Sequence, residues 1–144
     1  MRIIRPGKTK TKRLYRDVSK MVSRELIWLA ICIYHEARNQ PEEGRIAVGH
    51  VILNRVSKRG LSVKEVVLQP MQFSWANGGA RPPIKEYEAL EESCVSAEKC
   101  LNERLEGKDL WGSNLYYADY IEEPYWAKKA KFIKKIGNHI FFRE

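Results

Sequence analysis

Residues 24–37 read RELIWLAICIYHEA, and this stretch decides the fold. One set of its apolar residues recurs at helical i, i+3 and i+4 spacing; it consists of Leu26, Leu29, Ala30, Ile33 and Ala37. Further apolar residues fill the other sides, namely Ile27, Trp28, Ile31 and Cys32. A helix that is apolar on nearly every side is buried on most of them. The pattern therefore predicts a central core helix over residues 24–37.

Two more helices are predicted directly after this one. Pro41 breaks the chain, and acidic residues Glu42 and Glu43 then occupy a first helical turn, where the helix dipole favours negative charge. This second helix should run to about Val56 and bury Val48, Val51, Ile52 and Leu53. The sequence Ser62-Val63-Lys64-Glu65 has the form of a capping box and predicts a short helix ended by Pro70.

The second half of the chain changes character. Residues 71–83 are rich in Gly, Pro and Asn and predict a surface loop. An amphipathic helix follows, with Gly107 near its end and an expected buried stripe of Tyr87, Leu90, Cys94, Ala97 and Leu101. Residues 115–117 are strand-like, and apolar pairs flank a Gly137-Asn138 hairpin signal. The prediction is an α+β domain, mainly helical, with a small antiparallel sheet at the C-terminus.

Composition and charge limit the class of protein. A length of 144 residues with 44% hydrophobic residues suits one globular domain. Of the 26 Lys and Arg residues, nine lie in residues 1–24 against one acid, while the other residues carry 17 bases and 17 acids. We therefore divide the chain into a basic N-terminal arm, 1–22, and a domain, 23–144. We expect the arm to contact an anionic polymer or membrane surface through charge, without specific nucleic-acid binding.

The sequence also carries expectations about location and assembly. No apolar run approaches the roughly 18 residues that span a bilayer, and the N-terminus lacks the apolar region of a signal peptide. We therefore expect the protein to be made in the cytoplasm and to act outside it after release. Three cysteines do not form a disulfide framework. We expect a monomer with no cofactor and no metal.

Glu36 is the residue with the clearest chemical signal. It continues the apolar face of Leu29, Cys32 and Ile33 at the end of the predicted helix. Burial disfavours the charged carboxylate, so the pKa of Glu36 should rise, which suits a general acid near neutral pH. The alternative is that Glu36 turns outward and pairs with Arg38 or Arg45.

Several motifs in the same order along the chain resemble the SleB-like cell-wall hydrolase family, which includes spore-cortex-lytic enzymes and phage endolysins. They are Tyr34-His35-Glu36-Ala37-Arg38, Glu43-Gly44-Arg45-Ile46-Ala47-Val48, Val51-Ile52-Leu53-Asn54-Arg55-Val56, Gln72-Phe73-Ser74, Leu115-Tyr116-Tyr117 and Ile136-Gly137-Asn138-His139-Ile140-Phe141. The resemblance implies a lysozyme-like domain that cleaves the glycan strands of peptidoglycan, with Glu36 as the catalytic residue. The chain departs from the family at Asn39-Gln40, where the family often has Gly-Glu.

The resemblance further implies a lytic transglycosylase that cuts between N-acetylmuramic acid and N-acetylglucosamine and leaves 1,6-anhydro ends. One evident carboxyl is compatible with this, because Glu42 and Glu43 are better explained as helix-start charges and Asp119 as a turn residue. A hydrolytic muramidase, with a second carboxylate still to be found, is the alternative. The candidate substrate-binding residues are Gln72, Ser74, Tyr116, Tyr117 and His139. We also consider His139 as a surface histidine without a role in the site.

A zinc-dependent wall peptidase is a further alternative. His35-Glu36 begins a His-Glu-x-x-His pattern, but Asn39 stands where the second histidine is required. A zinc site would then need His35, His50 and His139 to converge.

Overall fold

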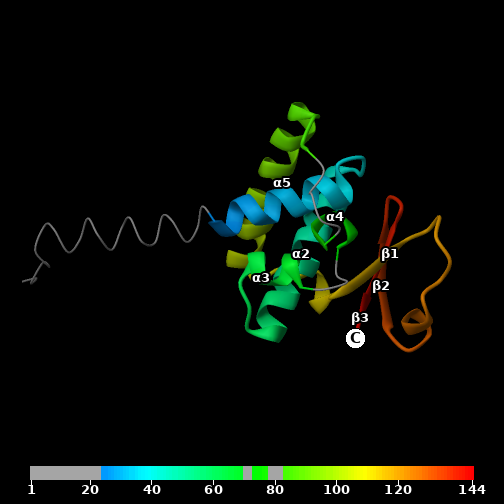
Figure 1. Ribbon diagram of the computed structural model, residues 1–144. Coiled ribbons are helices and arrows are strands. Elements are labelled where there is room, and N and C mark those ends of the chain that lie inside the picture. Colours follow the sequence, from blue (N-terminus) through cyan, green and yellow to red (C-terminus); the bar gives the residue numbers. More distant parts are fainter. Residues whose placement is uncertain (1–23, 70–72, 78–82) are drawn as a thin grey trace, which may run out of the picture.

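The computed structural model describes residues 24–69, 73–77 and 83–144, and it shows a group of helices followed by a sheet (Figure 1). The predicted basic arm, 1–22, lies outside these residues. Residues 24–37 are helical, as predicted. The later helices are α2 (Glu42–Arg59), α3 (Val63–Leu68), α4 (Ser74–Asn77) and α5 (Tyr87–Leu105), with short 3₁₀ turns η1 (Leu110–Gly112) and η2 (Tyr125–Lys128). The strands are β1 (Leu115–Ala118), β2 (Lys131–Ile136) and β3 (His139–Arg143).

The 24–37 helix forms the centre of the core. Its Leu29, Cys32 and Ile33 are fully buried in one cluster with apolar residues of α2, namely Val48, Val51 and Ile52. The burial is not complete on every side, because Ile27 is exposed. Within the described ranges, no helix has the length and apolar composition needed to cross a membrane.

Helix α5 confirms the predicted stripe only in part: Ala97 is fully buried, and Leu90 and Leu101 are half-buried. Its buried residues are small, Ser93, Ser96, Ala97 and Cys100, whereas Tyr87 and Cys94 of the expected stripe are exposed. Both serine hydroxyls are satisfied: Ser93 Oγ donates to the Ala89 carbonyl (2.8 Å) and Ser96 Oγ accepts from Arg45 Nε (2.9 Å). The small side chains bring α5 close to α2, where a Cβ on Gly49 would lie 2.9 Å from Cys100 Sγ.

The predicted short helix and the predicted loop had different outcomes. The capping box at the start of α3 is confirmed, because Ser62 Oγ accepts from the Glu65 amide (3.1 Å). The stretch predicted as a surface loop contains the helix α4, and Phe73 immediately before it is only 3% exposed. Phe73 belongs to the core and Trp75 packs against it, and this packing anchors a helical turn that the local composition does not favour.

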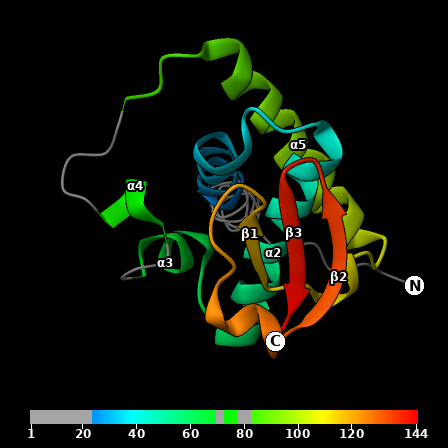
Figure 2. The same cartoon turned by 90° about the vertical axis from the view of Figure 1, so that its right-hand side faces the viewer.

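The sheet confirms the predicted C-terminal hairpin. Its strand order is β1-β3-β2, all antiparallel, and Figure 2 shows β3 between its two partners in front of the helices. Gly137 in the hairpin turn has a positive φ of 56°. The Asn138 amide donates to the buried Gln40 Oε1 (2.9 Å), and a Cβ on Gly137 would clash with that oxygen. Gln40 thus connects the hairpin to the linker before α2.

Candidate active site

Three segments that are distant in the sequence meet at Glu36. This residue lies in the last turn of the 24–37 helix and is half-buried. The hydroxyl of Tyr116, on β1, donates a hydrogen bond to Glu36 Oε2 (2.8 Å). The indole Nε1 of Trp75, on α4, donates to Glu36 Oε1 (3.2 Å). Each carboxyl oxygen therefore has one fixed neutral donor.

Burial dominates the electrostatics of this carboxyl. It raises the pKa of Glu36, and the hydrogen bonds from Tyr116 and Trp75 and the positive charge of Arg55 oppose that rise. The same burial, together with the charge of Glu36, raises the pKa of Tyr116 well above its ordinary value, so Tyr116 remains a hydroxyl donor. The predicted rise for Glu36 agrees with the structure.

The alternative ion pairs of Glu36 are not formed. Arg38 Nε instead lies 3.2 Å from Glu86 Oε2. Arg45 donates through Nη1 to the Gln40 carbonyl (2.8 Å) and through Nε to Ser96. Both guanidinium groups thus stabilise helix contacts, and the Glu36 carboxyl stays with its two neutral donors.

Two residues of α2 hold the segment that leads into β1. Asn54 Nδ2 donates to the carbonyls of Asp109 (2.8 Å) and Ser113 (2.7 Å). Arg55 is buried, and its Nε donates to the Asn114 carbonyl (2.9 Å). Because Tyr116 follows this segment by two residues, these bonds help to fix where its hydroxyl lies.

Trp75 has a role that the sequence did not reveal. Besides its bond to Glu36, its ring stacks on His35, with ring centroids 4.3 Å apart and an interplanar angle of 23°. Burial and the charge of Arg38 lower the pKa of His35, which favours a neutral imidazole beneath the indole. No spacing in the sequence connects residue 75 with residues 35 and 36, so only the fold shows this contact.

The structure separates the predicted substrate-binding residues. Tyr116 lies at Glu36, whereas the ring of Tyr117 packs against Phe142 (5.7 Å between centroids). Gln72 lies outside the described residues, and Ser74 begins α4. His139 is buried at 4% exposure with its ring 5.0 Å from that of Tyr116, so the interpretation as a surface histidine was wrong.

The three histidines of the zinc alternative make separate contacts. His35 stacks on Trp75, His50 Nε2 bonds Glu103 Oε1 (3.0 Å) and His139 lies against Tyr116. Across residues 24–69, 73–77 and 83–144, no three His, Cys, Asp or Glu side chains are grouped as a metal site.

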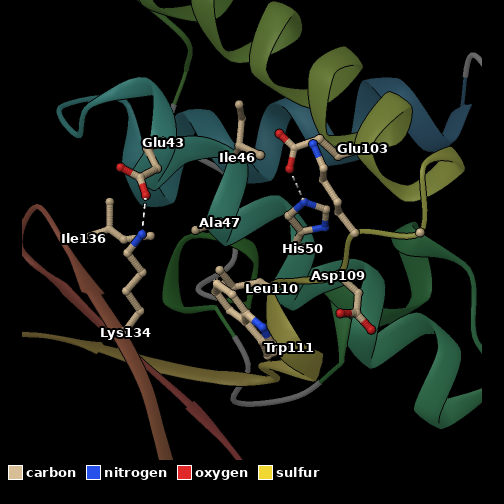
Figure 3. A pocket seen from close by; sticks show the side chains of 12 residues that line it. Glu43, Ile46, Ala47, His50, Glu103, Asp109, Leu110, Trp111, Lys134 and Ile136 are labelled. Carbon is tan, nitrogen blue, oxygen red and sulfur yellow. Dashed lines mark hydrogen bonds and ion pairs between the residues drawn. The ribbon is translucent and has the colours of Figure 1, made fainter.

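A pocket of about 600 Å³ lies elsewhere, between α2, the end of α5, η1 and β2 (Figure 3). Neither Glu36 nor Tyr116 lines it. The buried Glu36 carboxyl and this cavity are therefore two different places on the molecule. Glu36 remains the candidate acid, because burial raises its pKa and two neutral donors fix its carboxyl.

Comparisons with known proteins identify the family of the chain. The family model described as Cell Wall Hydrolase matches residues 39–142. The spore cortex-lytic enzyme of Bacillus cereus is 33% identical over 116 residues, covering 78% of this chain and 42% of that protein. The enzyme of the same name from Bacillus subtilis is 31% identical over 117 residues, covering 78% and 35%. The chain thus spans less than half the length of these curated relatives.

Solved structures give the same picture for the fold. The catalytic domain of the germination-specific lytic transglycosylase SleB from Bacillus anthracis superimposes with a TM-score of 0.64 at 28% identity, covering 83% of this chain and 93% of that one. The catalytic domain of Bacillus cereus SleB gives 0.66 at 27% identity, covering 84% and 91%. The predicted lysozyme-like α+β fold is confirmed.

Proposed function

Because this chain belongs to the cell wall hydrolase family, we propose that it cleaves the glycan strands of peptidoglycan as a lytic transglycosylase, with Glu36 as its acid and base. The names of the relatives support the substrate: two are spore cortex-lytic enzymes, and one structural neighbour is a lytic transglycosylase. The family model begins three residues after Glu36, so the support for Glu36 is its burial and its two hydrogen bonds in the structure.

The arrangement of the single carboxyl carries the proposal. Hydrolytic glycosidases place two carboxyl groups across the scissile bond, about 5–5.5 Å apart for retention and about 6.5–9.5 Å for inversion. Among the described residues, the side chains that act on the Glu36 carboxyl are Tyr116, Trp75 and Arg55, and none of them supplies a second carboxyl. A reaction that needs only one carboxyl, used twice, fits this site better than hydrolysis.

The proposed reaction transfers one proton out and one proton back. Protonated Glu36 donates to the oxygen between N-acetylmuramic acid and N-acetylglucosamine as the bond from that oxygen to muramic C1 breaks. The muramic C6 hydroxyl oxygen then bonds C1 and closes the 1,6-anhydro ring. Its proton passes to the Glu36 carboxylate, which restores the acid without consuming water.

The neighbours of Glu36 support both halves of this cycle. Burial keeps the carboxyl protonated at higher pH than usual, which favours the first step. The donors Tyr116 and Trp75 stabilise the carboxylate that exists between the two steps. We further propose that Gln72 and Ser74 contact the sugars, since they adjoin the Trp75 segment in sequence.

The substitution Glu36→Gln tests the assignment, because it keeps the shape but removes the titratable proton. We expect cleavage of purified peptidoglycan to fall by at least about a hundredfold, in line with the loss of general acid–base catalysis. Glu98→Gln, the same change at an exposed position of α5, is the matched control. Turnover by Glu36→Gln equal to that of the control would exclude Glu36.

The products decide between transglycosylation and hydrolysis. Mass spectrometry of the released fragments should show anhydro-muramic ends, about one water lighter than hydrolysed ends. Reducing muramic ends would assign the chain as a muramidase and require a second carboxyl.

We also propose that residues 1–22 hold the protein on the anionic wall or membrane surface by charge. Replacing Lys8, Lys10, Lys12 and Arg13 with Gln in the full chain should reduce sedimentation with purified walls at low salt. The difference from the unaltered chain should disappear at high salt, where such contacts are screened. Equal binding at low salt would contradict this role.

A further inference from the structure

We propose that the pocket between α2, η1 and β2 is a second binding site, which holds N-acetylated amino sugars of a glycan strand against Trp111. Its volume of about 600 Å³ lies within the usual range for small-ligand sites, about 300–1,000 Å³. The inference deepens the proposed function, because the ligand is a part of the same polymer. It concerns binding only and assigns no second reaction.

The pocket and Glu36 lie beside different faces of α2. Glu43, Ala47 and His50 line the pocket and recur at four and three residues, which places them on one face. Arg55, whose charge acts on Glu36, follows His50 by five residues and so points about 140° away from it. A ligand in the pocket therefore leaves the Glu36 carboxyl free.

At the rim of the pocket, the backbone that carries the Trp111 indole is strained. Leu110 and Trp111 have φ values of 54° and 51°, and they are the only non-glycine residues with positive φ in the described part of the chain. Such conformations cost energy and persist where the surroundings enforce them, often at ligand sites. Here the enforcing bonds come from Asn54 to the carbonyls on either side and from Arg143 Nη1 to the Trp111 carbonyl (3.2 Å).

The strained backbone does not bury the indole of Trp111. Trp111 remains 66% exposed, although its side chain is large and apolar. Leu110 beside it packs against the core and lines the pocket. In Figure 3 the Leu110 and Trp111 side chains are drawn next to each other, below His50. A strained residue that presents an exposed indole to a cavity is typical of a binding surface.

The inner wall carries a buried histidine. His50 is 2% exposed, and its Nε2 bonds Glu103 Oε1 at 3.0 Å. Its Nδ1 is buried and has no hydrogen-bond partner among the residues that the structure describes. Asp109 adds a carboxylate at the edge, and it forms no ion pair within the described residues.

The charges of the pocket identify the class of ligand. Its lining carries three carboxylates and two lysines, and the lysines face acidic partners, Lys134 with Glu43 (2.8 Å) and Lys108 with Glu106 (3.2 Å), so the pocket offers no excess positive charge to a phosphate or another anion. The remaining features are an aromatic face, a carboxylate acceptor and a buried imidazole. Together they suit an uncharged ligand with an apolar ring face, hydroxyl groups and an amide, which describes an N-acetylhexosamine.

A second site on the same polymer changes how the protein is retained. When one segment of a strand is bound in the pocket, a neighbouring segment reaches Glu36 at a high effective concentration. The pocket then adds a second contact that helps to hold the protein on the glycan strand.

The test uses N-acetylchitotriose, which contains no muramic acid and so lacks the bond that the proposed reaction cuts. The full ¹⁵N-labelled chain is titrated while the side-chain signals of Trp111, His50 and Trp75 are followed by NMR. Trp75 reports on the Glu36 site, and Trp111 and His50 report on the pocket. We expect Trp111 and His50 to shift together along one saturating curve.

The variant Trp111→Gly separates binding from folding. Glycine adopts the positive φ without strain, so the thermal midpoint should not fall, whereas affinity at His50 should weaken about three- to tenfold. Tyr125→Ala removes another exposed aromatic, on η2 and outside the pocket, and should leave the His50 titration unchanged.

Three results would overturn the inference: no shift of Trp111 or His50 at millimolar probe, an unchanged His50 titration in Trp111→Gly, or the same loss in Tyr125→Ala. The outcome is independent of the proposed reaction. If Glu36→Gln still cleaves walls but Trp111 shifts with the probe, the role of Glu36 is refuted and the pocket is not. If Glu36→Gln is inactive but Trp111 does not shift, only the pocket is refuted.

Discussion

Removing the hydroxyl of Tyr116 should shift the pH dependence of the reaction in a defined direction. In Tyr116→Phe the ring stays and only the 2.8 Å bond to Glu36 Oε2 is lost. This bond favours the ionised carboxyl and so lowers the pKa of Glu36. Its loss therefore raises that pKa further, and the proton needed for the first step is retained to higher pH.

The size of the shift follows from the kind of bond. A buried hydrogen bond to a charged group contributes about 1.5–3 kcal/mol, and each pH unit corresponds to about 1.4 kcal/mol. The decline of kcat/KM on the alkaline side should therefore move upward by about one to two pH units. The plateau below it should also fall, because the carboxyl loses one of its two positioning bonds.

The assay is the rate of muropeptide release from purified walls, measured from about pH 4 to pH 9. Tyr117→Phe is the matched control: it makes the same chemical change at the adjacent residue, whose ring packs against Trp126 and Phe142. Its alkaline limb should coincide with that of the unaltered chain. If the limb of Tyr116→Phe stays in place or moves to lower pH, Tyr116 does not stabilise the ionised form of Glu36.

Three further substitutions test other parts of the structure. Trp75→Phe removes the second donor to Glu36 and should shift the alkaline limb upward by less than Tyr116→Phe, since the indole contributes less to lowering the pKa; a larger shift would contradict this order. Glu36→Gln should raise the thermal midpoint at pH 7 but not near pH 3, because a carboxyl whose pKa is raised by folding lowers stability as pH rises through that pKa; equal midpoint changes at both pH values would be inconsistent with a buried acid. Gly49→Ala places a Cβ 2.9 Å from Cys100 Sγ. Even after the gain in helix propensity, it should lower the free energy of unfolding in urea by about 1 kcal/mol, and the double variant with Cys100→Ala should recover part of that loss. If the effects of the two substitutions on the free energy of unfolding are strictly additive, the contact is not supported.

The sequence predicted the elements whose signals are local. The 24–37 helix and α2 follow from apolar periodicity, α3 from its capping box and the hairpin from Gly137-Asn138. The position of Glu36 at the end of an apolar helix was sufficient to predict burial and a raised pKa. Each of these properties depends on neighbours within a few turns of the same helix or hairpin.

The features that the sequence did not predict depend on distant packing. The buried face of α5 is set by Gly49 on another helix, which admits Cys100 closely, so small residues are buried where periodicity favoured larger ones. Trp75 reaches Glu36 because Phe73 is held in the core, and no local pattern marks either contact. The left-handed backbone at Trp111 likewise depends on bonds from remote side chains.

The bond from the Asn138 amide to Gln40 has a consequence for the proposed reaction. Gln40 follows Glu36 by four residues, and Asn138 adjoins β3, the strand that pairs with the β1 strand carrying Tyr116. The segments that carry Glu36 and Tyr116 are therefore connected by hydrogen bonds before any substrate binds. In the proposed reaction, Glu36 and Tyr116 therefore need little rearrangement relative to each other, which lowers the free-energy cost of reaching the transition state.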